Sequence, residues 1–223
     1  MGIVHAGMAK HGQAWFAKDQ TAGKGQRGNT WLSNPGDNII LTVTLHPGSA
    51  FPIGCFYFNA FVALTCLKFL RNWDDKNFSI KWPNDLYWRD RKAGGILIEN
   101  VVQGKDWRWA VIGIGINVNQ AEFPSRLKNP TSLHLITGQT FETSNLAMNL
   151  HAMLLHDFDQ LTSSARLLPY YNKHLYRRGE RVRLKKGNST FETTIKEVDE
   201  FGRLHTEDTM ERSFDFGEVS WIL

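Results

Sequence analysis

Residues 20–31 contain the first of three short segments whose residue types suit the handling of phosphate and acyl groups. The run GKGQRG fits the spacing of a dinucleotide-binding glycine motif, but that motif requires a helix directly after its glycines. Here NTWLSNPG follows, which is typical of a turn, so we exclude that motif and also the Walker phosphate loop. The glycines would let a phosphate approach the backbone, Lys24 and Arg27 would neutralise it, and Trp31 would stack on a base. A solvated loop with one tryptophan in the core is the competing interpretation.

The second segment is KWPND at residues 81–85, where a predicted strand meets a proline and two good turn formers. A simple hairpin turn explains Asn84 and Asp85 equally well. However, Lys92 follows seven residues after Asp85 across a tight connection, and Ala-Gly-Gly comes next. We therefore expect Lys81 and Lys92 to point into one pocket. Two lysines beside one aspartate suit phosphoryl or acyl-adenylate chemistry, in which positioning and charge stabilisation do most of the work.

The third segment, GIGINVN at residues 113–119, places two glycines inside a predicted strand. Glycine weakens a strand, so it often marks a close approach by a ligand or another backbone. A bulge with Asn117 as a turn former is the alternative. The eight histidines and two cysteines form no metal-binding spacing, so we predict no metal site built from protein ligands.

The remaining pattern predicts the elements that hold these segments. Residues 38–46 are rich in β-branched types and predict a strand, as does the weaker alternation at 13–18. Apolar residues at helical spacing predict helices over 53–73 and 144–161, the second with Ser144 as its N-cap. Three further strands are predicted at residues 78–82, 93–102 and 107–118, the last two as an antiparallel hairpin.

The C-terminal part has a different residue pattern. From residue 180 onward the chain is a series of short alternating segments, which predicts a small five-strand barrel. We therefore divide the chain into residues 1–176 and 177–223. The larger part is predicted to be α+β, with a mixed or antiparallel sheet covered by helices.

Composition narrows the class of protein. The chain has 223 residues, 42% of them apolar and 22% charged, which is typical of a globular protein. The net charge of +4 is too small to predict nucleic-acid binding by itself. The longest apolar stretch, residues 51–70, is interrupted by polar side chains and predicts a buried helix, so we expect no membrane span. The start lacks the features of a signal peptide, and two cysteines cannot form a disulfide framework, so we expect a cytoplasmic protein.

Taken in order, the three segments resemble those of biotin–protein ligases. The resemblance rests on QTAGKGQRGNTW at 20–31, KWPNDLYWRDRKAGGILIE at 81–99 and GIGINVN at 113–119, and it extends to the final FGEVSWI. KWPND with a downstream KAGGI, correctly ordered between the other two segments, is the most specific part. The resemblance implies the class II synthetase-like fold of biotin and lipoate ligases, followed by a C-terminal SH3-like barrel.

The resemblance also implies a two-step reaction. Biotin and MgATP form biotinyl-5′-AMP, and the activated carboxyl is transferred to a lysine of a biotin carboxyl carrier domain, as in acetyl-CoA carboxylase. ATP and biotin are thus substrates, and Mg2+ accompanies ATP. Homodimers are common in the family, so a dimer stays open, and the helix-turn-helix of some relatives is not expected here. The alternatives are a lipoate–protein ligase, a non-catalytic module that binds biotin or the carrier, and a nucleic-acid-binding protein.

Matching positions carry the family's roles onto this chain as expectations. Lys24 and Arg27 would meet the phosphates. Lys92 would contact the reacting carboxylate or phosphate, and Asp85 would assist the acceptor lysine. These four are the expected catalytic residues, and Trp31 would pack on the adenine. The expected binding residues for biotin and ATP are Gln20, Gly23, Lys24, Gly25, Gln26, Trp31, Lys81, Asn84, Lys92, Gly95 and Asn117, with Gly95 beside the biotin and Asn117 beside the nucleotide.

Two departures from the family pattern matter. The family loop usually carries an arginine where this chain has Gln26, and that arginine helps to retain the adenylate. Arg27, one residue on, is the candidate replacement. The family also has a strand and a biotin-binding Ser-Thr-Asn segment upstream, whereas residues 1–12 here resemble the helix that follows them. We therefore expect the catalytic part to lack that strand and segment.

Overall fold

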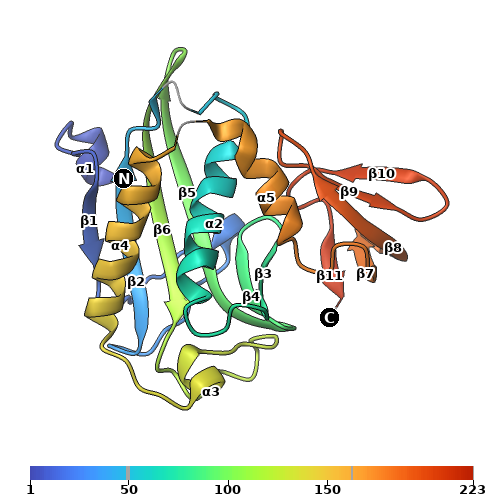
Figure 1. The fold of residues 1–223 in the computed structure, drawn as a ribbon, viewed down its shortest axis with the longest axis horizontal. Coiled ribbons are helices and arrows are strands. Elements are labelled where there is room, and N and C mark those ends of the chain that lie inside the picture. Colours follow the sequence, from blue (N-terminus) through green and yellow to red (C-terminus); the bar gives the residue numbers. More distant parts are fainter. Residues whose placement is uncertain (49–50, 162, 223) are drawn as a thin grey trace.

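The computed structural model describes residues 1–48, 51–161 and 163–222. The larger part of the molecule is built on a six-stranded sheet with helices packed on one face (Figure 1). All neighbouring strands in this sheet are antiparallel. In spatial order the strands are β1 (Gln13–Phe16), β2 (Asn38–Leu45), β6 (Asp106–Asn117), β5 (Arg91–Gln103), β4 (Asp85–Trp88) and β3 (Phe78–Lys81).

The three central strands form where the sequence predicts them. β2 is rich in isoleucine, valine and threonine, and all but one of its residues are buried. β5 and β6 are consecutive and pair along their length as the predicted hairpin, with Gly104 at a positive φ in the connecting turn. The antiparallel form of the predicted sheet is therefore confirmed.

β4 is a strand that the sequence pattern did not reveal. Its residues, DLYW, follow the turn at Pro83 directly, and sequence reasoning assigns them to a turn and a tight connection. Leu86 and Tyr87 are buried, and the strand pairs with both β3 and β5, so tertiary pairing defines an element too short to show a period. The hairpin turn is confirmed at residues 82–84, which include Asn84, whereas Asp85 lies on the strand that follows, opposite Lys81 on one side and Gly95 on the other.

The two long helices predicted from the sequence are α2 (Tyr57–Leu70) and α4 (Thr143–Asp159). α2 begins later than expected because Gly54 takes a positive φ in the turn before it. The predicted N-cap at Ser144 is wrong. Glu142 caps α4 instead, because its carboxylate accepts hydrogen bonds from the backbone N–H of Ser144 at 3.4 Å and from the Ser144 hydroxyl at 2.9 Å. The shorter helices are α1 (Gly2–His5), α3 (Leu133–Thr137) and α5 (Leu167–Lys173), with 3-10 turns at Gln26–Gly28 and Ser164–Arg166.

The main core lies between the sheet and α2. Nearly every side of α2 is apolar, and Phe61, Cys66 and Phe69 are each at most 2% exposed. Because α2 and α4 cover one face of the sheet, the other face is left to line a site (Figure 1). Within the described residues, no helix is long and apolar enough to cross a membrane.

A second antiparallel sheet follows, and its five strands are those predicted from residue 180 onward. Figure 1 shows them as a lobe beside α5. Among the described residues its edge strands, β10 and β11, do not pair with each other, so the closed barrel stays a prediction, as does the division at residue 176. In spatial order the strands are β10 (Glu211–Phe214), β9 (Leu204–Glu207), β8 (Ser189–Val198), β7 (Arg181–Lys186) and β11 (Ser220–Ile222).

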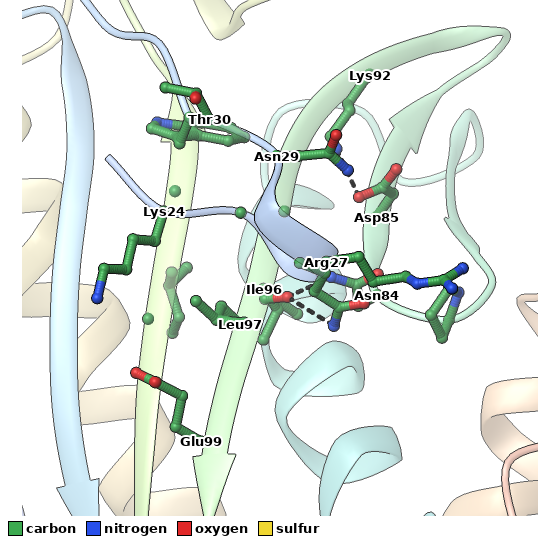
Figure 2. Close-up of a pocket in the computed structure, with 18 of the residues that line it drawn as sticks. Lys24, Arg27, Asn29, Thr30, Asn84, Asp85, Lys92, Ile96, Leu97 and Glu99 are labelled. Carbon is green, nitrogen blue, oxygen red and sulfur yellow. Dashed lines mark hydrogen bonds and ion pairs between the residues drawn. The ribbon is translucent and has the colours of Figure 1, made fainter. Parts of the chain in front are cut away.

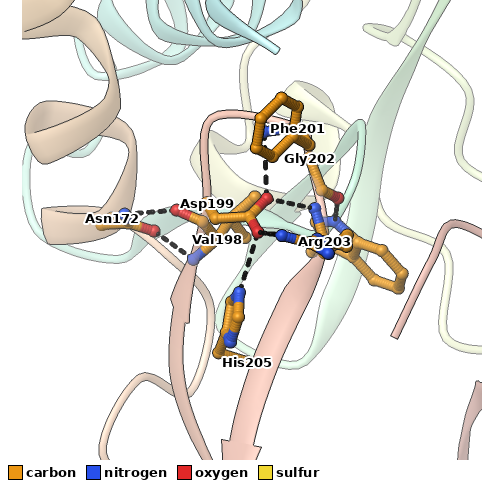
Figure 3. A network of polar contacts seen from close by, with 8 residues as sticks. Asn172, Val198, Asp199, Phe201, Gly202, Arg203 and His205 are labelled. Atoms are coloured by element: carbon orange, nitrogen blue, oxygen red, sulfur yellow. Dashed lines mark hydrogen bonds and ion pairs between the residues drawn. The ribbon is translucent and has the colours of Figure 1, made fainter. Parts of the chain in front are cut away.

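The turn between β8 and β9 connects this second sheet to the first (Figure 3). Asp199 holds the turn together through its carboxylate. One oxygen accepts from the backbone N–H groups of Phe201 and Arg203 at 3.0 and 2.9 Å, and the other contacts Arg203 Nε at 2.8 Å and His205 Nε2 at 3.0 Å. The turn presents the carbonyl of Gly202 to the indole N–H of Trp82, which donates at 2.8 Å. The C-terminal sheet is therefore fastened to the segment that leads into Asp85.

Candidate functional site

A cavity of about 650 Å³ lies against the sheet face that the helices leave uncovered. The loop at 20–31 and the segment at 81–85 form two walls of the cavity (Figure 2). Residues 216, 217 and 219–221 of the C-terminal part form a third wall. The floor includes alternate residues of two central strands, because residues two apart share one face of a strand. These are Gly95, Leu97 and Glu99 of β5, and Val111, Gly113 and Gly115 of β6.

The glycine loop is a small hairpin whose shape explains its first glycine. The backbone N–H of Trp31 donates to the carbonyl of Gly23 at 3.0 Å, and that of Gly25 donates to Asn29 at 2.7 Å. A Cβ on Gly23 would lie 2.3 Å from the carbonyl oxygen of Trp31, so a larger residue would force the loop open. Gly23 thus shapes the loop from outside the cavity wall.

The indole of Trp31 lies against the glycines of the central strands. A Cβ on Gly115 would lie 2.6 Å from the Trp31 ring, and one on Gly95 would lie 3.5 Å from it. The close approach that glycines inside a strand predict is therefore made by an aromatic side chain. Trp31 Nε1 is buried and has no hydrogen-bond partner within the described part of the chain. A buried unpaired donor costs about 1–3 kcal/mol, which an acceptor on a bound ligand would relieve.

Lys92 and Asp85 form an ion pair in the cavity wall, with 2.6 Å between Nζ and Oδ1. The pairing of β4 with β5 brings them together, and Lys92 Nζ also lies 5.9 Å from the centre of the Trp31 ring. The two side chains are 33% and 24% exposed, so a ligand can reach both. The pair offers an ammonium group to an anion and a carboxylate oxygen to an incoming amine.

Lys81 lies deeper in the wall and is only 9% exposed. Its Nζ donates to the Tyr87 hydroxyl at 3.0 Å and lies 4.7 Å and 5.4 Å from the ring centres of Tyr87 and Trp221. Burial lowers the pKa of Lys81 to about 8; Asp85 opposes this change and nearby lysines add to it. Lys81 is therefore a cation whose burial is unfavourable, and an anion bound in the cavity would offset that cost.

Asn84 and Gln26 share one hydrogen-bond acceptor. The Asn84 side chain donates to the carbonyl of Ile96, and Gln26 Nε2 donates to the same oxygen at 3.5 Å (Figure 2). The backbone N–H of Ile96 donates in return to the carbonyl of Asn84 at 3.1 Å. Gln26 stands where the family usually has an arginine. Its side-chain amide therefore connects the loop to β5 and brings no charge into the cavity.

Arg27 reaches toward the C-terminal sheet. Its Nη1 donates to the carbonyl of Gly217 at 2.5 Å, and its guanidinium carbon lies 5.7 Å from the centre of the Phe216 ring. The Arg27 backbone has a positive φ of 56°, which few residues other than glycine adopt. Its expected contact with a phosphate stays a prediction, and it requires the side chain to leave Gly217.

Most of the residues singled out from the sequence do meet in this cavity, but Gly23 and Asn117 do not line it. Asn117 is buried at the end of β6, where its side chain donates to the carbonyl of Thr131 at 2.9 Å. Its expected place beside a nucleotide therefore stays a prediction. The expected residues that line the cavity are Gln20, Lys24, Gly25, Gln26, Arg27, Trp31, Lys81, Asn84, Asp85, Lys92 and Gly95.

The sequence did not predict that side chains of the C-terminal lobe would line the cavity. Phe216, Ser220 and Trp221 line the cavity, although the sequence places FGEVSWI only in the predicted barrel. Two aromatic side chains close to a short polar turn were the available signal. Glu99 was also missed, because one acidic residue in a strand carries no distinguishing pattern.

The chain itself provides little for a metal ion. Across residues 1–48, 51–161 and 163–222, no group of three or more His, Cys, Asp or Glu residues is placed to hold one. The carboxylates in the cavity lining are Glu99 and Asp85, and Asp85 is already paired with Lys92. A divalent cation would have to bring most of its ligands along, as Mg2+ bound to nucleotide phosphates does.

The structure thus combines an antiparallel sheet that carries helices on one face with a glycine loop over a cation-lined cavity on the other. The model of the Biotin/lipoate A/B protein ligase family matches residues 6–117, about half of the chain. The chain belongs to this family.

Individual relatives agree with that assignment. The Bifunctional ligase/repressor BirA of Escherichia coli is 39% identical over 114 residues, which are 50% of this chain and 35% of that protein. A Biotin--[acetyl-CoA-carboxylase] ligase of Paracoccus denitrificans is 36% identical over 109 residues, 48% of this chain and 45% of that one. The matches thus span less than half the length of these relatives.

One solved structure extends the likeness over nearly the whole chain. The biotin protein ligase from Aquifex aeolicus, in complex with biotin and ATP, has a TM-score of 0.77 at 26% identity. The superposition covers 95% of this chain and 89% of that one, so it includes the C-terminal sheet. The predicted α+β ligase fold is confirmed.

Proposed function

We propose that this protein is an ATP-dependent ligase that converts biotin to biotinyl-5′-AMP and transfers the biotinyl group to a lysine of a biotin carboxyl carrier domain. The observation that carries the proposal is the Lys92–Asp85 pair beside Trp31, in a cavity of about 650 Å³. That volume lies within the usual range for ligand pockets, about 300–1,000 Å³. The similar Aquifex structure holds biotin and ATP.

In the first step, an oxygen of the biotin carboxylate attacks the α-phosphorus of ATP. The bond to the bridging oxygen breaks, and pyrophosphate leaves with its electron pair. Both reactants are anions that repel each other, so the enzyme must supply positive charge where they meet. Lys24, Arg27 and Lys92 are accessible cations of the wall, and Lys81 is a buried one. Trp31 offers a ring face for the adenine.

In the second step, the neutral amine of the acceptor lysine attacks the carbonyl carbon of the mixed anhydride. A C–N bond forms, the C–O bond to the phosphate breaks, and AMP leaves. The amine must lose a proton, and Asp85 is the carboxylate in the wall that can orient or accept it. The loop at 20–31 would close over the intermediate and keep water from hydrolysing it.

The proposal includes a partner and a compartment. The carrier domain is the expected partner, ATP is expected as its Mg2+ complex, and we propose no role for nucleic acid or a membrane. A homodimer stays a prediction. Cys55 and Cys66 are free thiols, which fits a reducing compartment and supports the cytoplasm.

The second candidate is lipoate as the activated acid, because the name of the matched family covers both biotin and lipoate ligases. ATP–pyrophosphate exchange separates the two when biotin or lipoate is the only acid present. We expect exchange with biotin, at least about tenfold slower exchange with lipoate, and a sharp loss in Lys92→Ala. Exchange with lipoate alone would replace the substrate. No exchange with either acid in a folded sample would favour a non-catalytic binding module.

A further inference from the structure

Asp85 lies between two lysines that belong to neighbouring strands. On one side its direct partner in the sheet is Lys81 of β3. On the other side the register of β4 and β5 shifts after Leu86, and this shift makes Lys92 the partner of Tyr87. Partners across an antiparallel pair share a face, as do residues two apart on one strand. Lys81, Asp85 and Lys92 therefore start from the same face of the sheet.

The carboxylate of Asp85 pairs with only one of these lysines. Its Oδ1 lies 2.6 Å from Lys92 Nζ. Lys81 forms no ion pair with a carboxylate in the part of the chain that the structure describes. Opposite charges placed directly across two strands attract each other, and the stem of a lysine is long and flexible. Another contact must therefore hold the Lys81 ammonium away from Asp85.

Tyr87 supplies that contact through its hydroxyl. Lys81 Nζ donates to this oxygen at 3.0 Å and lies 4.7 Å from the centre of the Tyr87 ring. Burial raises the pKa of Tyr87, and the nearby negative charge of Asp85 raises it further. The phenol therefore stays neutral. A neutral acceptor fixes the ammonium without cancelling its charge, whereas a carboxylate would cancel it.

Tyr87 is itself held in a defined place. It is buried, and its ring centre lies 5.1 Å from that of Tyr176. The Tyr176 hydroxyl donates to Asp90 at 2.6 Å and accepts from Arg177 Nε at 2.9 Å. This anchoring fixes the position of the acceptor for Lys81 before any ligand is bound.

We propose that Tyr87 is a positioning residue for Lys81, because its hydroxyl keeps the ammonium away from Asp85. Lys81 thereby keeps a free charge for an anionic ligand, and Asp85 stays paired with Lys92. Without the hydroxyl, the carboxylate of Asp85 becomes the acceptor for Lys81. The two charges then cancel, and Lys92 must share its partner. This inference rests on the proposed function, because it assigns Lys81 to the phosphates of ATP.

The first test needs no ligand. Nuclear magnetic resonance of the full chain with isotope-labelled lysine follows the titration of Lys81, whose signal is identified by its loss in Lys81→Met. In the parent chain burial lowers the pKa of Lys81 to about 8; Asp85 opposes this change, and Lys92 and Lys128 add to it. We expect Tyr87→Phe to raise the titration midpoint by about one pH unit, because a carboxylate stabilises an ammonium more strongly than a phenol does. In an Asp85→Asn background the same substitution should lower the midpoint, because no carboxylate replaces the lost hydroxyl.

The second test is calorimetric titration of the full chain with ATP. Tyr87→Phe should weaken ATP binding about tenfold, because Asp85 then neutralises Lys81. In the Asp85→Asn background the same substitution should weaken binding by less than about threefold, since Lys81 has no carboxylate to pair with. A residue that only supports the fold would give the same loss in both backgrounds.

Tyr176→Phe is the matched control. It removes the same atom from the ring beside Tyr87, but that hydroxyl contacts Asp90 and Arg177 rather than Lys81. Tyr176 also lies outside the lining of the first cavity. This variant should keep the Lys81 midpoint and the ATP Kd of the parent chain. Circular dichroism reports on the folding of every variant.

Three results would overturn the proposal. A lower or unchanged Lys81 midpoint in Tyr87→Phe would show that the ammonium does not move to Asp85. An equal loss of ATP affinity in both backgrounds would indicate a role in the fold alone. Equal effects of Tyr87→Phe and Tyr176→Phe would show that the Tyr87 hydroxyl has no special part. If the parent chain does not bind ATP, the proposed function fails, and the midpoint still decides the role of Tyr87 because its measurement needs no ligand.

Discussion

Replacing Lys81 by methionine is expected to stabilise the protein at neutral pH while removing a cation from the candidate active site. Methionine has a similar length and fills the space beside Tyr87 and Trp221 without carrying a charge into the wall. Active sites commonly hold such unfavourable groups, so a gain in stability at the expense of activity is the expected pattern. The position is suitable because Lys81 is 9% exposed and its environment is well defined.

The size of the effect follows from the pKa of Lys81. Burial lowers that pKa from 10.5 to about 8, and each pKa unit corresponds to about 1.4 kcal/mol of preference for the neutral form. The charged form therefore costs the folded state about 3 kcal/mol at pH 7. Loss of the hydrogen bond to the Tyr87 hydroxyl offsets about 1 kcal/mol of this gain. We expect Lys81→Met to raise the free energy of unfolding by about 2 kcal/mol.

The pH dependence has a definite sign. In the unfolded chain Lys81 keeps its ordinary pKa of 10.5, so between about pH 8 and 10.5 the unfolded state binds more protons than the folded state. Stability of the parent chain therefore gains from this group as pH rises through that window. The cost is complete below pH 8 and vanishes above 10.5, so the advantage of Lys81→Met should shrink steadily across the window.

Urea unfolding at pH 7, 8, 9 and 10 measures this difference. Lys105→Met is the matched control, because Lys105 is exposed in the turn between β5 and β6 and its replacement should change stability little at any pH. A less stable Lys81→Met at pH 7 would refute the reasoning. So would an advantage at pH 10 as large as the one at pH 7, since it could not come from a titrating ammonium group.

The remaining predictions concern the loop and its supports. Gly115→Ala should displace Trp31 and raise the KM for ATP about tenfold. Gly113→Ala is the control, because its new Cβ would meet no atom nearer than 3.6 Å, and its KM should not change. Similar effects of both substitutions would refute the contact between Gly115 and Trp31. Trp82→Phe should lower the free energy of unfolding, measured by urea titration, by about 1–3 kcal/mol, because the carbonyl of Gly202 loses its hydrogen-bond donor. An unchanged free energy would show that water replaces the indole as the donor. Gln26→Arg should slow the release of biotinyl-5′-AMP about tenfold in a filter-retention assay; unchanged release would indicate that this position does not hold the intermediate.

The sequence predicts the helices and strands that are long enough to show a periodic pattern of apolar residues. Residues 38–46 are β-branched and lead to β2, and the apolar spacing in 53–73 leads to α2, because both elements are long enough for burial to leave a pattern. β4 has four residues and exists only because β3 and β5 flank it. Glu142 caps α4 through its side chain although Ser144 is the commoner capping type.

The candidate site likewise has contacts that the sequence predicts and contacts that it does not. KWPND and Lys92 are close in sequence, and the short β4–β5 connection brings Asp85 and Lys92 together as expected. Trp31 on Gly115 joins segments far apart in the chain, so the sequence predicts a close approach but not the group that makes it. The contribution of Trp221 depends on how the second sheet packs on the first, for which no local pattern exists.

Intact-mass analysis of a biotin carboxyl carrier domain, after incubation with this chain, biotin and MgATP, tests the central claim most directly. We predict a mass gain equal to one biotinyl group, dependent on ATP, lost in Lys92→Ala and absent when lipoate replaces biotin. No gain in the carrier domain, from a folded chain under conditions in which a known biotin ligase modifies that domain, would contradict the proposed transfer.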